Sequence, residues 1–234
     1  MNAQRHIWLI AIVVALLAGC GPKTRWDHTP RDEHVVRTGE TLYAIAFRYG
    51  KDPKELSRWN KLGNGSLIYP GQVLRLTPPP GMAASGSSGQ TTKSGSSVSS
   101  SGSLPPIPNQ PSPPLRWPTA GKVVVEFGNR PGSGTGILIE GRAGQPIEAA
   151  SGGRVVYSGG GLIGYGQLII LKHNDTYLSA YGHNASLLVA EGETVKKGQH
   201  IATMGEGPGR EPRLHFEIRK NGEPVNPRQY LPAR

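Results

Sequence analysis

The sequence predicts a mainly β protein that carries a small α+β module, with a flexible linker between its two folded parts. Short apolar runs alternate with glycine turns over residues 116–234, a pattern typical of antiparallel sheets. A β-α-α-β pattern occupies residues 34–77. Between them, residues 78–115 are rich in Pro, Ser and Gly and hold a single charged residue, Lys93. Such a composition buries too little apolar surface to fold, so it predicts a linker.

Composition and charge narrow the class of protein. The 234 residues include 33 Gly and 21 Pro, and only 36% are hydrophobic, which argues against one compact helical core. The formal charge of +10 favours contact with an anionic partner such as a membrane surface or a cell-wall polymer. Because the basic residues are spread along the chain and do not form a dense stripe, we expect no nucleic-acid partner.

The N-terminus predicts export and lipid attachment. Residues 1–19 place one basic side chain before an apolar run that ends in small residues, as in a secretory signal peptide. The end of this segment, Leu17–Cys20, resembles the bacterial lipobox, which implies cleavage before Cys20 and lipidation of its thiol; the alternative is an ordinary signal that ends at a cysteine by chance. Residues 20–33 would then be a lipidated tether. Gly21 follows the cysteine where an Asp commonly retains lipoproteins at the inner membrane, so the resemblance implies the outer membrane, facing the periplasm.

Each element of the N-terminal module, residues 34–77, has a local signal. Thr41 can cap a first helix that Gly50 ends, and Asp52 with Pro53 can begin a second. Apolar residues recur at helical spacing in both helices, at Leu42, Ile45, Ala46, Tyr49, Leu56 and Trp59. The flanking strands are expected at Val35–Arg37 and Val73–Leu76.

The stretch Val36–Ala46, with Trp59-Asn60 and Ile68–Gln72, resembles a LysM domain. Such domains bind N-acetylglucosamine-containing glycans, in bacteria peptidoglycan, between two loops. The residues that the resemblance assigns to those loops are Thr38, Gly39, Glu40, Thr41, Leu42, Leu67, Ile68, Tyr69, Pro70 and Gly71. Short polar groups and backbone amides beside Leu and Tyr suit the hydroxyls and apolar ring faces of a sugar. The alternative is that Leu42, Trp59 and Tyr69 belong only to the core.

The C-terminal module, residues 116–234, is predicted to be all-β and mostly antiparallel. Its expected strands lie at 121–127, 153–157, 166–172, 177–181, 198–202 and 214–219. The stretch Gly144–Gly159, followed by Gly164–His173, Tyr181–His183 and Leu214–Phe216, resembles the LytM or lysostaphin-type peptidase domain. Active members are zinc endopeptidases that cut peptidoglycan crosslinks.

Aligned on this family, the metal site is degenerate. Gly134 stands at the position of the first His ligand and Leu138 at that of the Asp ligand, so only His215 is retained. Arg213 replaces the other His of the His-x-His motif, and a guanidinium offers no lone pair to a metal. Because zinc catalysis needs about three protein ligands and an open position, we expect no metal, no cofactor and no peptidase activity.

The combination of lipobox, LysM-like module, linker and degenerate LytM-like module resembles the NlpD family of outer-membrane lipoproteins. The resemblance implies activation of a periplasmic N-acetylmuramoyl-L-alanine amidase at the septum, where peptidoglycan is split and daughter cells separate. The sequence does not fix the oligomeric state, and a monomer is the default expectation. Tyr165, Tyr181, His183, Arg213 and His215 are the candidate residues of an amidase-binding groove. Two rival interpretations stay open, a zinc-dependent peptidoglycan endopeptidase and a pure peptidoglycan tether.

Overall fold

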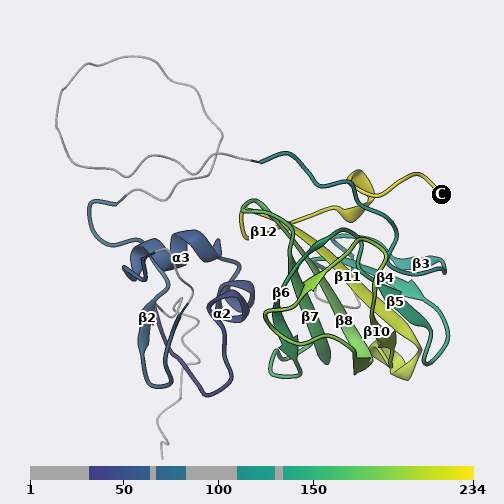
Figure 1. The fold of residues 1–234 in the computed structure, drawn as a ribbon, viewed down its shortest axis with the longest axis horizontal. Coiled ribbons are helices and arrows are strands. Elements are labelled where there is room, and N and C mark those ends of the chain that lie inside the picture. The colour runs from purple at the N-terminus through teal and green to yellow at the C-terminus, as the bar shows by residue number, and fades with distance from the viewer. Residues whose placement is uncertain (1–31, 64–66, 83–109, 130–133) are drawn as a thin grey trace, which may run out of the picture. The chain divides into compact units, whose positions relative to one another are not determined.

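The computed structural model describes residues 32–63, 67–82, 110–129 and 134–234 (Figure 1). These described residues belong to one compact unit, Asp32–Arg234. The predicted signal peptide, the lipidation site Cys20 and most of the predicted linker lie outside the described residues. Within the described part, no helix is both long enough and apolar enough to cross a membrane.

The N-terminal module has the predicted β-α-α-β order. Its elements are β1 (Glu33–Val35), α2 (Leu42–Tyr49), α3 (Pro53–Trp59) and β2 (Val73–Arg75). The two strands pair antiparallel, with Glu33 opposite Arg75. The first strand therefore begins and ends two residues earlier than the sequence predicts, because Val36 already leaves the ladder to exchange backbone hydrogen bonds with the loop at Gly71 and Gln72.

The predicted helix caps are confirmed. The hydroxyl of Thr41 accepts a hydrogen bond from the Ala44 amide, and Gly50 ends α2 in the left-handed conformation with φ of 60°. The carboxylate of Asp52 accepts from the Lys54 amide, and Pro53 is the first residue of α3. These local signals therefore set where α2 ends and where α3 begins.

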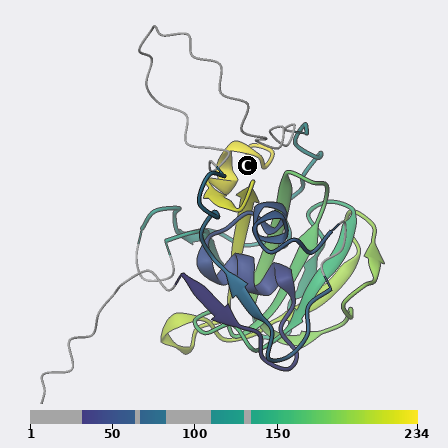
Figure 2. The same ribbon diagram turned by 90° about the vertical axis from the view of Figure 1, so that its left-hand side faces the viewer.

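The C-terminal module is a ten-stranded antiparallel sheet whose strands lie side by side in both views (Figure 1 and Figure 2). The strand order is β3-β4-β11-β8-β7-β6-β9, and β5, β10 and β12 pair off this path. The strands are β3 (Val123–Val125), β4 (Ile137–Glu140), β5 (Pro146–Glu148), β6 (Gly153–Gly159), β7 (Gln167–Lys172), β8 (Tyr177–Leu187), β9 (Thr194–Val195), β10 (His200–Met204), β11 (Arg213–Lys220) and β12 (Glu223–Val225). Two short 3-10 helices, Pro208–Arg210 and Pro227–Gln229, complete the described part.

All six predicted strands are present, and the mainly β fold class is confirmed. The sequence missed β4, β5, β9 and β12, of which β5, β9 and β12 have three residues or fewer. β8 extends to Leu187, well beyond the predicted end at 181. Runs this short lack a period that could be read from sequence alone.

Side chains of the sheet alternate between a core face and an opposite face. On β11, Leu214, Phe216 and Ile218 join the main hydrophobic cluster with residues such as Ile137 and Ile169. The intervening residues of β11 point the other way and are still buried, which places polar side chains in an enclosed environment.

The end of the predicted linker is part of the folded structure. The amide of Gln110 donates to the Thr176 hydroxyl, and the side chain of Asn174 donates to the carbonyl of Pro111. Leu115 is buried in the main hydrophobic cluster. Residues 110–115 therefore lie against the sheet, because their prolines still offer carbonyl acceptors and one large apolar side chain.

Candidate functional site

A charged network lies on the non-core face of β11. Alternation along the strand brings His215, Glu217 and Arg219 to this face, and Glu217 is fully buried. Its Oε1 accepts from Arg219 Nε at 2.6 Å, and its Oε2 accepts from the Thr135 hydroxyl at 2.7 Å and lies 3.1 Å from His215 Nε2. A buried carboxylate is tolerated here because each oxygen has hydrogen-bond donors and a cation is adjacent.

Opposing effects set the pKa of Glu217. Burial alone would raise the pKa, but the hydrogen bond with His215 and the Arg219 guanidinium outweigh burial and hold it below its ordinary value. The carboxylate is therefore ionised at neutral pH. The sequence prediction did not include Glu217, Arg219 or Thr135; the alternation of β11 was the signal that could have found the first two.

Tyr165 and His183 lie beside His215. The Tyr165 ring packs edge-on against the His215 ring at 5.2 Å between centroids, and the His183 ring lies 6.1 Å from it. The backbone amide of His183 donates to the carbonyl of Tyr165 at 2.8 Å, which ties the two segments together. We refer to Tyr165, His183, His215 and Glu217 as the histidine cluster. Burial and the nearby His215 lower the pKa of His183 to about 4, so its imidazole is neutral at neutral pH.

The position opposite His215 is apolar. Leu138 on β4 pairs directly with His215 on β11, and directly paired residues of an antiparallel sheet project from the same face. Leu138 is buried and carries no donor atom. Gly136 allows the His215 ring to lie against the backbone, since a Cβ at this position would stand 2.9 Å from the ring's Cε1.

Gly134 and Arg213 flank this arrangement. Gly134 adopts a left-handed φ of 71°. Arg213 pairs across the strands with Glu140, and its guanidinium forms an ion pair with Glu211. Among the described residues, no group of three or more His, Cys, Asp or Glu side chains is placed to hold a metal ion.

One residue predicted for the amidase-binding groove, Tyr181, does not lie with the histidine cluster. It is fully buried on the core face, where its ring packs against Phe216 and its hydroxyl accepts from the Ala150 amide at 2.9 Å. Burial raises the pKa of this hydroxyl to about 12. Tyr181 is a core residue because it pairs with Phe216, whereas Gly182 pairs with His215 on the other face.

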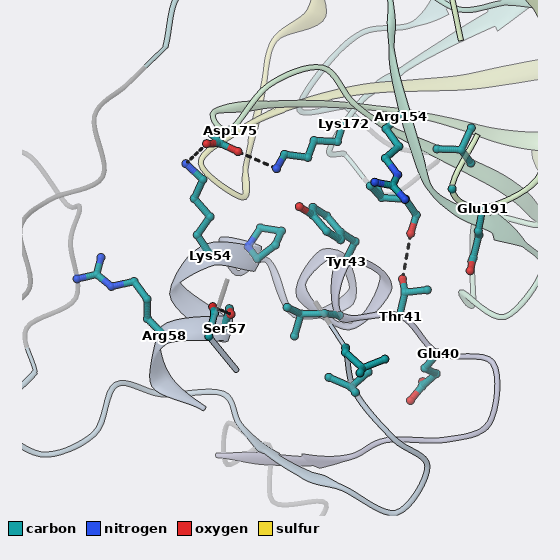
Figure 3. Close-up of a pocket in the computed structure, with 18 residues that line it drawn as sticks. Glu40, Thr41, Tyr43, Lys54, Ser57, Arg58, Arg154, Lys172, Asp175 and Glu191 are labelled. Atoms are coloured by element: carbon teal, nitrogen blue, oxygen red, sulfur yellow. Dashed lines mark hydrogen bonds and ion pairs between the residues drawn. The ribbon is translucent and has the colours of Figure 1, made fainter. Parts of the chain in front are cut away.

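The predicted glycan loops meet at a pocket of about 810 Å³ (Figure 3). Five of the ten candidate residues line it, namely Glu40, Thr41, Leu42, Leu67 and Ile68. Thr38, Gly39, Tyr69, Pro70 and Gly71 are exposed beside it but are not among its lining residues. Leu42 and Trp59 belong mainly to the hydrophobic core of the module, as their alternative interpretation expects, whereas Tyr69 is 62% exposed.

Charged side chains of α3 and of the C-terminal sheet also line this pocket. Lys54 of α3 and Lys172 of β7 both point toward Asp175, with N–O distances of 3.5 and 2.7 Å (Figure 3). Arg154 of β6 lines the same pocket and is exposed. The lining therefore combines apolar, hydroxyl and charged groups, a mixture suited to a polar ligand with apolar faces.

Two known domain families match the chain. Residues 34–77 match the LysM domain, and residues 132–227 match Peptidase family M23. The chain therefore combines a LysM domain with an M23 peptidase-type domain. The M23 domain resembles solved structures that include the antimicrobial peptidase lysostaphin from Staphylococcus simulans, at 29% identity, 47% coverage of this chain, 48% of that chain and a TM-score of 0.44.

The chain is also similar in sequence to curated lipoproteins. The chain is 38% identical to a "Lipoprotein NlpD/LppB homolog" of Pseudomonas aeruginosa, over 98% of this chain and 92% of that protein. It is 58% identical over 119 residues to the "Murein hydrolase activator NlpD" of Escherichia coli, which covers 51% of this chain and 31% of that protein. The chain belongs to the NlpD/LppB family of lipoproteins, which confirms the family that the sequence motifs indicated.

Proposed function

We propose that this protein is a non-catalytic lipoprotein that binds peptidoglycan and activates a periplasmic N-acetylmuramoyl-L-alanine amidase. The Escherichia coli and Salmonella relatives are named murein hydrolase activators, which supports activation over hydrolysis. The M23 domain supplies the surface that contacts the enzyme, and the LysM domain supplies the attachment to the cell wall.

The observation that carries this proposal is the chemistry opposite His215. A hydrolytic zinc needs about three protein ligands and an open site for water. Here the cross-strand neighbour of His215 is Leu138, an aliphatic side chain, and the next residue on the same face of β11 before His215 is Arg213, a permanent cation. A cation and an alkyl group beside one imidazole disfavour a bound Zn²⁺, whereas the same surface can still contact a protein.

Glycan binding is assigned to the two LysM loops. Leu67 and Tyr69 expose apolar surface, at 67% and 62%, beside the polar Glu40 and Thr41. A glycan offers matching hydroxyls, acetamido groups and apolar ring faces. We propose that the glycan chain lies across these loops and enters the pocket between Thr41 and Ile68.

The anchor and the location follow from the N-terminal motif. Lipid on Cys20 would attach the mature chain to the outer membrane on its periplasmic side, and several acyl chains make such attachment durable. A relative is named an outer membrane antigenic lipoprotein. We also propose that the protein is a monomer and is enriched at the septum.

Activation is proposed to be a shift in the conformational equilibrium of the amidase. A partner can move such an equilibrium only by binding one state more tightly than the other. Tyr165, His183, Arg213 and His215 are the proposed contacts, because aromatic residues and Arg are enriched among side chains that dominate binding energy.

The test uses the lipid-free mature chain, residues 21–234, on dye-labelled peptidoglycan, alone and with periplasmic amidases, before and after EDTA treatment of the chain. We expect no dye release by the chain alone and EDTA-independent stimulation of an amidase. Zinc-dependent release by the chain alone would establish the endopeptidase. Peptidoglycan binding without stimulation of any amidase would establish the tether.

A further inference from the structure

Helix α2 has two apolar faces that are buried in different places. Leu42, Ile45 and Ala46 belong to the hydrophobic core of the LysM domain. Ala44 and Phe47 are also only 2% exposed, but they belong to a separate cluster. Its other buried members all come from the M23 domain and are Tyr157, Leu162, Leu168, Ile170, Leu178 and Ala180. The second face of α2 is therefore buried by the M23 sheet and not by the LysM core.

Phe47 lies at the centre of this contact. Arg219 Nη1 donates to the Phe47 carbonyl at 2.7 Å, and the same guanidinium lies 3.5 Å from the centroid of the Phe47 ring. The Phe47 ring also packs edge-on against Tyr165 at 5.3 Å. Since Tyr165 contacts His215 and Arg219 pairs with Glu217, Phe47 adjoins the charged network of β11 and the histidine cluster.

Weaker polar contacts surround the buried centre. The Thr41 hydroxyl donates to the Val156 carbonyl at 3.2 Å, and Lys54 lies 3.5 Å from Asp175 (Figure 3). Arg48 donates to the Gly161 carbonyl at 3.4 Å. Half-exposed ion pairs contribute little to stability, so the apolar side chains of α2 and the Arg219 contact dominate the interaction.

We propose that helix α2 is an intramolecular cover of the partner-binding surface. While Ala44 and Phe47 are docked on the M23 sheet, an amidase cannot reach Tyr165 and the neighbouring residues, and undocking of α2 opens the surface. This inference rests on the proposed function, since the excluded partner is the amidase. The apparent affinity for the amidase is then the intrinsic affinity multiplied by the fraction of molecules that are open.

Two substitutions on the second face of α2 test the cover. In the mature chain, Ala44→Glu places a carboxylate in the buried cluster, and Phe47→Lys places an ammonium group beside the Arg219 guanidinium. Both substitutions leave the LysM core residues unchanged. The matched controls are Val73→Glu and Val73→Lys, which put the same two charges on a LysM residue that is 53% exposed. Amidase binding is measured by titration, and far-UV circular dichroism checks that both domains remain folded.

We expect Ala44→Glu and Phe47→Lys to bind the amidase at least about tenfold more tightly than the unsubstituted chain does. Val73→Glu and Val73→Lys should bind it as the unsubstituted chain does. Small-angle scattering should show a larger radius of gyration for the two α2 variants alone. Unchanged or weaker amidase binding by both variants, with both domains folded, would overturn the cover while leaving the proposed function intact. If the unsubstituted chain and all variants fail to bind any amidase, the proposed function fails and the cover fails with it.

Discussion

Replacing Tyr181 with Phe separates the stability role of this residue from any role in partner binding. The lost hydroxyl accepts from the Ala150 amide at 2.9 Å and lies 2.8 Å from the Ser179 hydroxyl, and Ala150 is fully buried. The Ala150 N–H would be left without an acceptor and without access to water. Such a group costs about 1–3 kcal/mol, so we expect the free energy of unfolding to fall by this amount.

Urea unfolding of the mature chain measures this loss, and amidase stimulation is measured on the same samples at a temperature where both proteins are folded. We expect full stimulation by Tyr181→Phe, because its side chain lies on the core face. Tyr165→Phe is the matched control: its hydroxyl is 3.4 Å from Glu217 Oε2, and its half-buried position predicts a smaller loss of stability. Undiminished stability, or loss of stimulation by folded Tyr181→Phe, would refute the assignment of Tyr181 to the core.

Three further predictions concern the charged network and the glycan loops. Glu217→Gln leaves the buried Arg219 guanidinium without a carboxylate and should cost about 3–5 kcal/mol in urea unfolding; a cost below about 1 kcal/mol would contradict the network. Because folding lowers the pKa of Glu217 from its ordinary value of 4.5, its stabilisation is complete above that pH and is lost as the pH falls through the lowered value. Thermal melts between neutral and acidic pH should show a larger loss in the unsubstituted chain than in Glu217→Gln, because Glu40 and Asp175, whose pKa values are also lowered, contribute to the loss in both. Tyr69→Ala removes an exposed ring and should weaken peptidoglycan co-sedimentation roughly tenfold without lowering Tm, whereas Val73→Ala should change neither.

Local signals predicted the N-terminal module well. Thr41, Gly50, Asp52 and Pro53 act through hydrogen bonds and backbone preferences that depend only on adjacent residues, so the sequence contains the information directly. The burial of Phe47 against the M23 domain could not be predicted in this way. Its position lies off the apolar face that the helical spacing predicts, and its partner Arg219 is 172 residues away in sequence. A large apolar residue on the expected outer face of the helix indicated that this face is buried, but it did not identify the surface that buries it.

The error at Tyr181 has a backbone cause. Strict alternation would place Tyr181 and His183 on the same face of β8. His183 instead adopts a left-handed φ of 62°, and the pairing with β7 shifts register between Gln167–Asn184 and Ile169–Tyr181. This irregularity brings His183 to His215 and leaves Tyr181 in the core. A non-glycine residue in such a conformation is uncommon, so sequence alone gives no reason to expect it.

Whether the protein activates an amidase or is itself an enzyme is tested by identifying the bond that is cut when the mature chain, an amidase and peptidoglycan are combined. Mass spectrometry of the released products distinguishes the amide between muramic acid and L-alanine from the peptide bonds of crosslinks. We expect cleavage of the amide alone, increased by the chain and abolished when the amidase carries an inactivated active site. Crosslink cleavage that persists with the inactivated amidase would contradict it, because the M23 domain would then be an enzyme.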